Sequence, residues 1–217
     1  MTTTACQPAT AITRSLLGYG VVAGVVYVGV SLAQAATREG FDITRHAWSL
    51  LANGRYGWIQ TANLALTGLM VIAFAVGLHR ALRPGRGSRW APRLIAGYGA
   101  GMLAAAVFRA DPAMGFPAGT PDGPVTVTLT GTLHLVCAGI GFLCLVAACF
   151  VVASRYADEG RRGWAAYSRV TGVVFLAGFA GVATGRSALT LAFVGAVIAA
   201  WAWMAAVAID RYRLSSV

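Results

Sequence analysis

The sequence predicts an all-α polytopic membrane protein with six transmembrane helices and a short interfacial helix in the first outer loop. Hydrophobic residues make up 58% of the 217 residues and charged residues only 11%, whereas a soluble domain carries roughly 25% charged residues. The apolar residues also occur in runs of about 20, the length that crosses a bilayer as a helix. Both observations predict a single membrane domain that covers residues 1–217.

Six spans follow from windows of about 20 mostly apolar residues. The first window comes after a polar leader with a single arginine and is long enough to span, so we expect a retained helix rather than a cleaved signal peptide. Short polar or arginine-rich segments separate most of the later windows. The expected spans are 15–36, 59–82, 91–108, 131–153, 164–185 and 188–209.

Glycines four residues apart recur within three of these spans. Small residues at this spacing let two membrane helices approach closely. We expect them to serve packing within the bundle, with a dimer interface as the alternative. The pairs are Gly20 with Gly24, Gly97 with Gly101, and Gly181 with Gly185.

The distribution of arginine predicts a multi-pass protein of the cell membrane with both termini in the cytoplasm. If the N-terminus is inside, 12 of the 17 arginines fall in cytoplasmic segments and five in outer segments, which agrees with the positive-inside rule. The net charge of +10 does not indicate a nucleic-acid partner, because the arginines do not gather on one face or tail. Tyr156, Trp164, Tyr167 and Arg169 are expected to anchor the cytoplasmic interface, with a second site as the alternative.

The first outer loop, residues 37–58, is expected to contain a short amphipathic helix that lies along the outer interface. Asp42 is a good N-cap and Gly54 a good helix stop. The polar face of this helix is either solvated or turned toward a pocket, and Trp48 would anchor it. Helical spacing places Ile43, Ala47, Leu50 and Leu51 on the apolar face, and Asp42, Arg45, His46, Ser49 and Asn53 on the polar face.

The second outer loop begins with FRADPAMGFPAGTPDGP, residues 108–124, which holds two Asp, one Arg, four Pro and three Gly. Proline fixes backbone angles and glycine permits tight turns, so we expect an ordered loop rather than a flexible linker. Arg109 and Asp111 lie at its root, where they form an ion pair or part of a site. Asp122 lies near the tip and is expected to be solvated.

Further polar residues lie at the outer ends of two spans. Gln60 and Asn63 open the second span, and His134 lies just inside the fourth. Histidine suits general acid–base chemistry, and arginine binds phosphate or carboxylate through paired hydrogen bonds. No metal site is predicted, because the two outer histidines lack a metal-binding spacing. The candidate catalytic residues are His46, Asp111 and His134, and the candidate ligand-binding residues are Arg45, Ser49, Gln60, Asn63 and Arg109.

Two motifs in the outer loops make the chain similar to a known family. The first reads FDITRHAWSLLANGRYGWIQ and the second DPAMGFPAGTP. On these motifs the chain resembles the bacterial integral-membrane family known as domain-of-unknown-function family 998, over about residues 15–210. The resemblance implies a six-helix membrane protein without an agreed activity. The matching residues are Phe41, Asp42, Arg45, His46, Ser49, Leu50, Leu51, Gly57, Trp58, Ile59 and Gln60, then Asp111, Pro112, Gly115, Phe116, Pro117, Gly119, Thr120 and Pro121.

Three kinds of function compete. The favoured hypothesis is a membrane-embedded enzyme or binding protein for a lipid or isoprenoid-like molecule, with its polar site at the extracytoplasmic face. It requires Arg45, His46, Arg109 and Asp111 to converge around the ligand's head while the tail lies between spans. A non-catalytic membrane subunit or scaffold is the alternative. A small transporter is less favoured, because no span carries a central charged residue. The bilayer is the expected partner, and the cofactor and the oligomeric state stay open.

Overall fold

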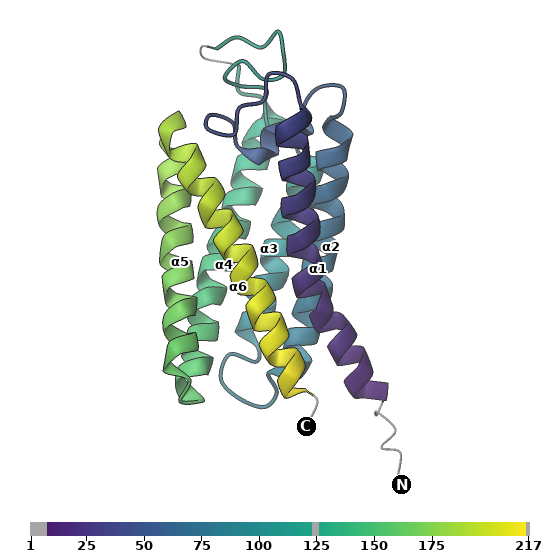
Figure 1. Ribbon diagram of the computed structural model, residues 1–217, viewed down its shortest axis with the longest axis vertical. Helices are drawn as coiled ribbons and strands as arrows, with labels where there is room; N and C mark the ends of the chain where they lie inside the picture. Colours follow the sequence, from purple (N-terminus) through teal and green to yellow (C-terminus); the bar gives the residue numbers. More distant parts are fainter. Residues whose placement is uncertain (1–7, 123–125, 216–217) are drawn as a thin grey trace.

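The structure, a computed structural model, describes residues 8–122 and 126–215, which form six long α-helices, two short 3-10 helices and no β-strand. The expected all-helical class is therefore confirmed. Figure 1 shows the six long helices side by side in one bundle. In chain order the elements are α1 (Pro8–Thr37), η1 (Trp48–Ala52), α2 (Gly57–Ala81), α3 (Trp90–Val107), α4 (Leu129–Asp158), α5 (Arg162–Ala183), η2 (Ser187–Leu189) and α6 (Thr190–Leu214).

The long helices close into a ring. Each packs against the next one in the chain, and α1 also packs against α6. The start of α1 and the end of α6 lie at one end of the bundle, while η1 and the loops that precede α2 and α4 lie at the other (Figure 1). The two ends are called here the terminal end and the loop end.

Five of the helices are long and apolar enough to cross a membrane, namely α1, α2, α4, α5 and α6. The exception is α3, which has 18 residues and carries Pro92 and Arg93 in its first turn. At 1.5 Å per residue it is still about 27 Å long, and it packs between α2 and α4.

Glycine allows close contact between neighbouring helices. A Cβ at Gly20 would lie 2.7 Å from the ring of Phe74 and 2.8 Å from Ala208, so α1 touches both α2 and α6 at this point. A Cβ at Gly101 would lie 2.9 Å from Gly141, where α3 meets α4. At these positions the glycine spacing serves packing within the bundle, as expected.

The expected amphipathic α-helix of the first outer loop is replaced by a turn at residues 43–45 and the 3-10 helix η1. The carboxylate of Asp42 accepts hydrogen bonds from the backbone N–H and the hydroxyl of Thr44, which closes a tight local turn instead of a helix. The element that follows is buried rather than interfacial: it contacts α1 and α2, and Trp48 is only 4% exposed. Trp48 packs 5.8 Å from the ring of Tyr27 and is not a lipid-facing anchor.

The second outer loop is held by backbone hydrogen bonds and by one buried aromatic residue. Ala113 and Phe116 exchange two backbone hydrogen bonds of 3.1 and 3.0 Å. The ring of Phe116 is 1% exposed and packs edge-on against Phe41, 5.2 Å away. Gly115 and Gly119 adopt positive φ angles of 84° and 91°, which glycine adopts without strain.

An ionic network joins the helices at the terminal end. Glu159 accepts hydrogen bonds of 2.7 and 2.8 Å from Arg211, which is 4% exposed. Asp210 accepts from Arg161 and, at 2.9 Å, from the hydroxyl of Tyr156. Tyr156 is fully buried, so it is part of this network and not the interfacial anchor that the sequence led us to expect.

Candidate functional site

A cavity of about 210 Å³ lies inside the helix ring at the loop end. Its walls come mainly from the loop-end halves of α3, α4, α5 and α6, and residues 47–49 before and within η1 cover it. A single water molecule needs roughly 10–15 Å³ of such space. The cavity can therefore accept part of an organic ligand.

The lining of the cavity is apolar and aromatic, with four polar side chains and no charged one. Phe142 packs 5.2 Å from Phe179 and 5.6 Å from Phe193 to form one aromatic wall. An isolated ion buried in such surroundings would lose far more hydration energy than a neutral group. The polar lining residues are Tyr27, Ser49, Tyr98 and His134.

His134 is the polar lining residue whose tautomer follows from a hydrogen bond. Its Nδ1 lies 2.8 Å from the carbonyl oxygen of Phe108. Because a carbonyl can only accept, Nδ1 carries the proton and Nε2 of the neutral ring keeps a lone pair. The side chain is 4% exposed, and Nε2 has no hydrogen-bond partner among residues 8–122 and 126–215. His134 can therefore accept a hydrogen bond from a ligand.

The lining of the cavity includes exposed residues at the loop ends of α4 and α5. Leu135 on α4 lines the cavity and is 68% exposed, and Ala183 on α5 lines it and is exposed as well. Toward the terminal end the interior is filled by buried side chains such as Leu145 and Trp203, each 1% exposed. The cavity thus opens sideways, toward the region that lipid would occupy around the bundle.

The two outer loops contact each other above the cavity, as the sequence led us to expect. His46, 2% exposed, accepts a hydrogen bond at Nδ1 from the backbone N–H of Asp42, and its Nε2 lies 2.8 Å from the carbonyl oxygen of Met114. A backbone N–H can only donate, so the proton sits on Nε2 and is donated to Met114. Met114 has a φ of 54°, which L-residues rarely adopt, and the bond helps to hold it there. Both ring nitrogens of His46 are therefore used to join the loops.

Arg45 and Arg109 both lie on the surface of the loop end. Arg45 forms an ion pair of 3.0 Å with Asp122, and the two side chains are 45% and 75% exposed. Arg109 is exposed and makes no ion pair or hydrogen bond within the part of the chain that the structure describes. Neither arginine lines the cavity. Asp122 is exposed, as expected for the tip of the second loop, and it is bound to the first loop.

Asp111 caps the start of α4 instead of pairing with Arg109. Its two oxygens accept hydrogen bonds from the backbone N–H of Thr128 at 2.9 Å and from its hydroxyl at 2.6 Å. Thr128 in turn accepts from the backbone N–H of Gly131. Asp111 therefore positions the helix that carries His134.

Gln60 and Asn63 belong to a polar network between α1 and α2. Gln60 Oε1 accepts a 2.8 Å hydrogen bond from Gln34, and Asn63 donates to the carbonyl of Tyr27 at 3.2 Å and to Ser31 at 3.3 Å. Gln60 and Asn63 are 0% and 4% exposed and do not line the cavity. Hydrogen bonds of this kind hold membrane helices together.

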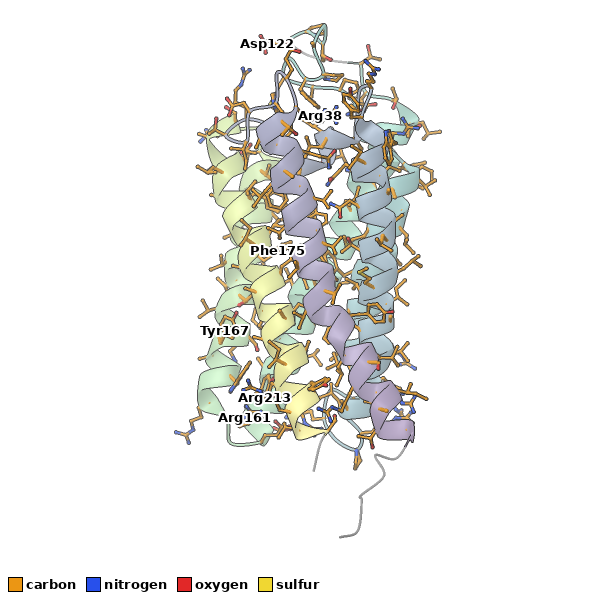
Figure 2. The ribbon with its side chains drawn as sticks, turned by 45° about the vertical axis from the view of Figure 1, so that its right-hand side comes forward. Arg38, Asp122, Arg161, Tyr167, Phe175 and Arg213 are labelled. Carbon is orange, nitrogen blue, oxygen red and sulfur yellow. The ribbon has the colours of Figure 1, made fainter. Side chains whose placement is uncertain are left out.

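Arg38 is a residue of the loop end that sequence reasoning missed. It donates to the carbonyls of Leu51 at 3.2 Å and Asn53 at 2.6 Å, and its guanidinium lies 5.3 Å from the ring centre of Phe116. Burial lowers the pKa of Arg38, partly offset by the charge interaction with Tyr56. Figure 2 shows Arg38 beneath the loop that carries Asp122. Arg38 thus ties η1 to the second loop.

Of the eight residues singled out from the sequence, the structure brings Ser49 and His134 to the cavity. Tyr27 and Tyr98 were missed, although a tyrosine far from the ends of an apolar span is a signal, because tyrosine favours membrane interfaces. No cluster of three or more His, Cys, Asp or Glu suited to a metal ion occurs among the described residues.

The comparison with protein families matches residues 21–210 to the family described as "Protein of unknown function (DUF998)". The chain belongs to this family. The DUF998 match covers both outer loops and the whole cavity, and the resemblance seen in the loop motifs is confirmed. Neither the curated proteins nor the solved structures gave a match to this DUF998 chain.

Proposed function

We propose that the chain crosses the cell membrane six times, with the terminal end in the cytoplasm. An even number of crossings agrees with the start of α1 and the end of α6 at one end of the bundle (Figure 1). Twelve of the 17 arginines then face the cytoplasm, as the positive-inside rule favours. Of the six helices, α3 is the one whose composition alone does not indicate a span, and its place between two apolar helices supports its inclusion.

We further propose that the protein binds a lipid or isoprenoid-like molecule in the cavity at the loop end. The observation that carries this proposal is an apolar cavity of about 210 Å³ that opens between α4 and α5 and contains His134. Ligand sites are mostly apolar with a few placed polar groups. An apolar chain would enter sideways from the outer leaflet, and η1 would separate it from the water outside.

The polar end of the ligand is a neutral group such as a hydroxyl or a carbonyl. No arginine lines the cavity to bind a phosphate or carboxylate. His134 accepts a hydrogen bond from a ligand hydroxyl through Nε2. The hydroxyls of Tyr27, Ser49 and Tyr98 are available as hydrogen-bond donors or acceptors. If the bound molecule reacts, His134 is the lining side chain suited to proton transfer.

The shape of the cavity favours a binding site over a transport path. A path for solutes would continue toward the terminal end, where Leu145, Cys149 and Trp203 are buried instead. The residues that line the cavity lie in the loop-end half of the bundle or, like Tyr98, at mid-height. A scaffold that only supports another protein would use His134 through its hydrogen bond to Phe108, but it would leave Nε2 without a role.

Mass spectrometry of the lipids that copurify with the protein tests this function. Ala138 lines the cavity, and Ala138→Trp would fill it, whereas Ala192→Trp places the same side chain on the exposed face of α6. We expect a neutral apolar molecule with the wild type and with Ala192→Trp, and its loss from Ala138→Trp. Arg45→Ala should leave the molecule bound, because Arg45 lies outside the cavity. The same lipids at the same ratios in all samples would contradict the proposal.

A further inference from the structure

A second hollow lies between α1 and α6 in the terminal-end half of the bundle, away from the cavity. It has a volume of about 350 Å³ and an almost entirely apolar surface. Val21 lies seven residues after Arg14 on α1, which is about 10 Å along the helix axis. The α1/α6 groove therefore extends from the level of the arginines into the apolar part of the bundle. Its lining includes Leu17, Gly18 and Val21 of α1 and Ala208, Ile209 and Arg213 of α6.

Two arginines stand at the terminal end of this groove. The guanidinium of Arg14, one turn before Gly18, lies 4.1 Å from the ring centre of Tyr212, and its Nε is buried without a hydrogen-bond acceptor. Arg213 lines the groove and is exposed. Neither guanidinium forms an ion pair with an acidic residue in the part of the chain that the structure describes.

The neighbouring arginines are neutralised by acidic residues. Arg211 binds Glu159 through two hydrogen bonds, and Arg161 binds Asp210. Figure 2 shows Arg161 and Arg213 at the same end of the bundle. No acidic side chain lines the groove, so the groove combines an apolar surface with two positive charges at one end.

We propose that the α1/α6 groove binds one anionic phospholipid. The acyl chain would lie along Leu17, Val21 and Ile209, and the phosphate would lie between Arg14 and Arg213. Charge complementarity selects this occupant, because a second copy of the chain would bring another apolar helix face and leave both arginines without an anion. Basic pockets between membrane helices bind acidic headgroups in this way. The site is independent of the ligand proposed for the cavity.

The glycines of α1 offer a matched pair of variants. A Cβ at Gly18 would meet no other atom within 4 Å, and the same is true at Gly29 on the same helix. Gly18→Leu would therefore place an apolar side chain in the groove, with its Cβ in open space. Gly29→Leu makes the same chemical change on α1 outside the groove.

Native mass spectrometry of the detergent-solubilised full chain, titrated with phosphatidylglycerol or phosphatidylcholine, tests the proposal. We expect wild-type protein to bind one phosphatidylglycerol in preference to phosphatidylcholine. Replacing both arginines, Arg14→Gln with Arg213→Gln, should weaken phosphatidylglycerol binding by roughly 30-fold. Gly18→Leu should also weaken it, and Gly29→Leu should not. The control pair Arg162→Gln with Arg169→Gln, both exposed on α5, should bind as the wild type does.

Three results would overturn the assignment. One is equal binding of the two lipids by the wild type, and another is unchanged phosphatidylglycerol binding by the double arginine variant. The third is a dimer that Gly18→Leu abolishes while lipid binding stays the same, since the groove would then hold a second copy. If Gly18→Leu does not fold, the comparison of the two arginine pairs still decides the question.

Discussion

The ionic network at the terminal end lets us predict how much Glu159→Gln lowers the free energy of unfolding. Burial by itself would raise the pKa of Glu159, but the hydrogen bonds and charges of Arg211 and Arg155 lower it from 4.5 to about 2. A shift of this size corresponds to about 3 kcal/mol of stabilisation. Because Glu159 is 22% exposed, water reduces the effect, and we expect Glu159→Gln to destabilise the protein by about 2–3 kcal/mol at neutral pH.

The pH dependence of this stabilisation has a defined sign. The pKa of Glu159 is lower in the folded protein than in the unfolded chain, so its contribution is complete above about pH 5 and is lost as the pH falls toward 2. Thermal unfolding in detergent micelles, followed by tryptophan fluorescence between pH 7 and pH 3, measures it. The difference in melting temperature between the wild type and Glu159→Gln should shrink as the pH is lowered.

The adjacent residue provides the control. Asp158 pairs with Arg86 at 3.4 Å, but the two side chains are 46% and 65% exposed. Exposed pairs contribute about 0–1 kcal/mol, so Asp158→Asn should unfold close to the wild-type temperature at every pH. Equal effects of Asp158→Asn and Glu159→Gln would refute the reasoning, since buried and exposed partners would then be equivalent.

Two further predictions concern the loop end. His46→Ala removes the link between Asp42 and Met114, so hydrogen exchange should become faster in both outer loops. The free energy of unfolding should fall by about 1–3 kcal/mol. Unchanged exchange in the second loop would contradict the link. A Cβ at Gly131 would overlap the carboxylate of Asp111, so Gly131→Ala should lower the melting temperature. Gly195→Ala, where a Cβ meets open space, should leave the melting temperature unchanged. Equal melting temperatures of Gly131→Ala and Gly195→Ala would contradict the capping role of Asp111.

The helices could be predicted from hydropathy because the bilayer imposes one strong requirement, about 20 apolar residues per crossing. The prediction placed the ends of α1 and α4 less well: α1 begins at Pro8 and α4 extends to Asp158, beyond the apolar windows. Polar residues such as Arg155 continue a helix where they find partners, and Glu159 is such a partner. Hydropathy does not contain that information.

The first outer loop shows why the candidate site could be predicted only in part. The spacing of its apolar residues fits an amphipathic helix at an interface, but it also fits a buried 3-10 element such as η1. Which of the two forms depends on whether the mouth of the helix ring is wide enough to admit Trp48, and a single sequence does not state that width. Polar residues gave a similar ambiguity: Gln60 and Asn63 form hydrogen bonds with each other and with residues of α1, whereas His134 retains a free nitrogen at the cavity.

The most direct test of the proposed function is a density map of the protein in lipid nanodiscs, at a resolution that shows individual side chains. We predict elongated density between the outer ends of α4 and α5 that continues into the cavity and ends within hydrogen-bond distance of Nε2 of His134. A cavity that contains only water, or one closed by the side chains around it, would contradict the account.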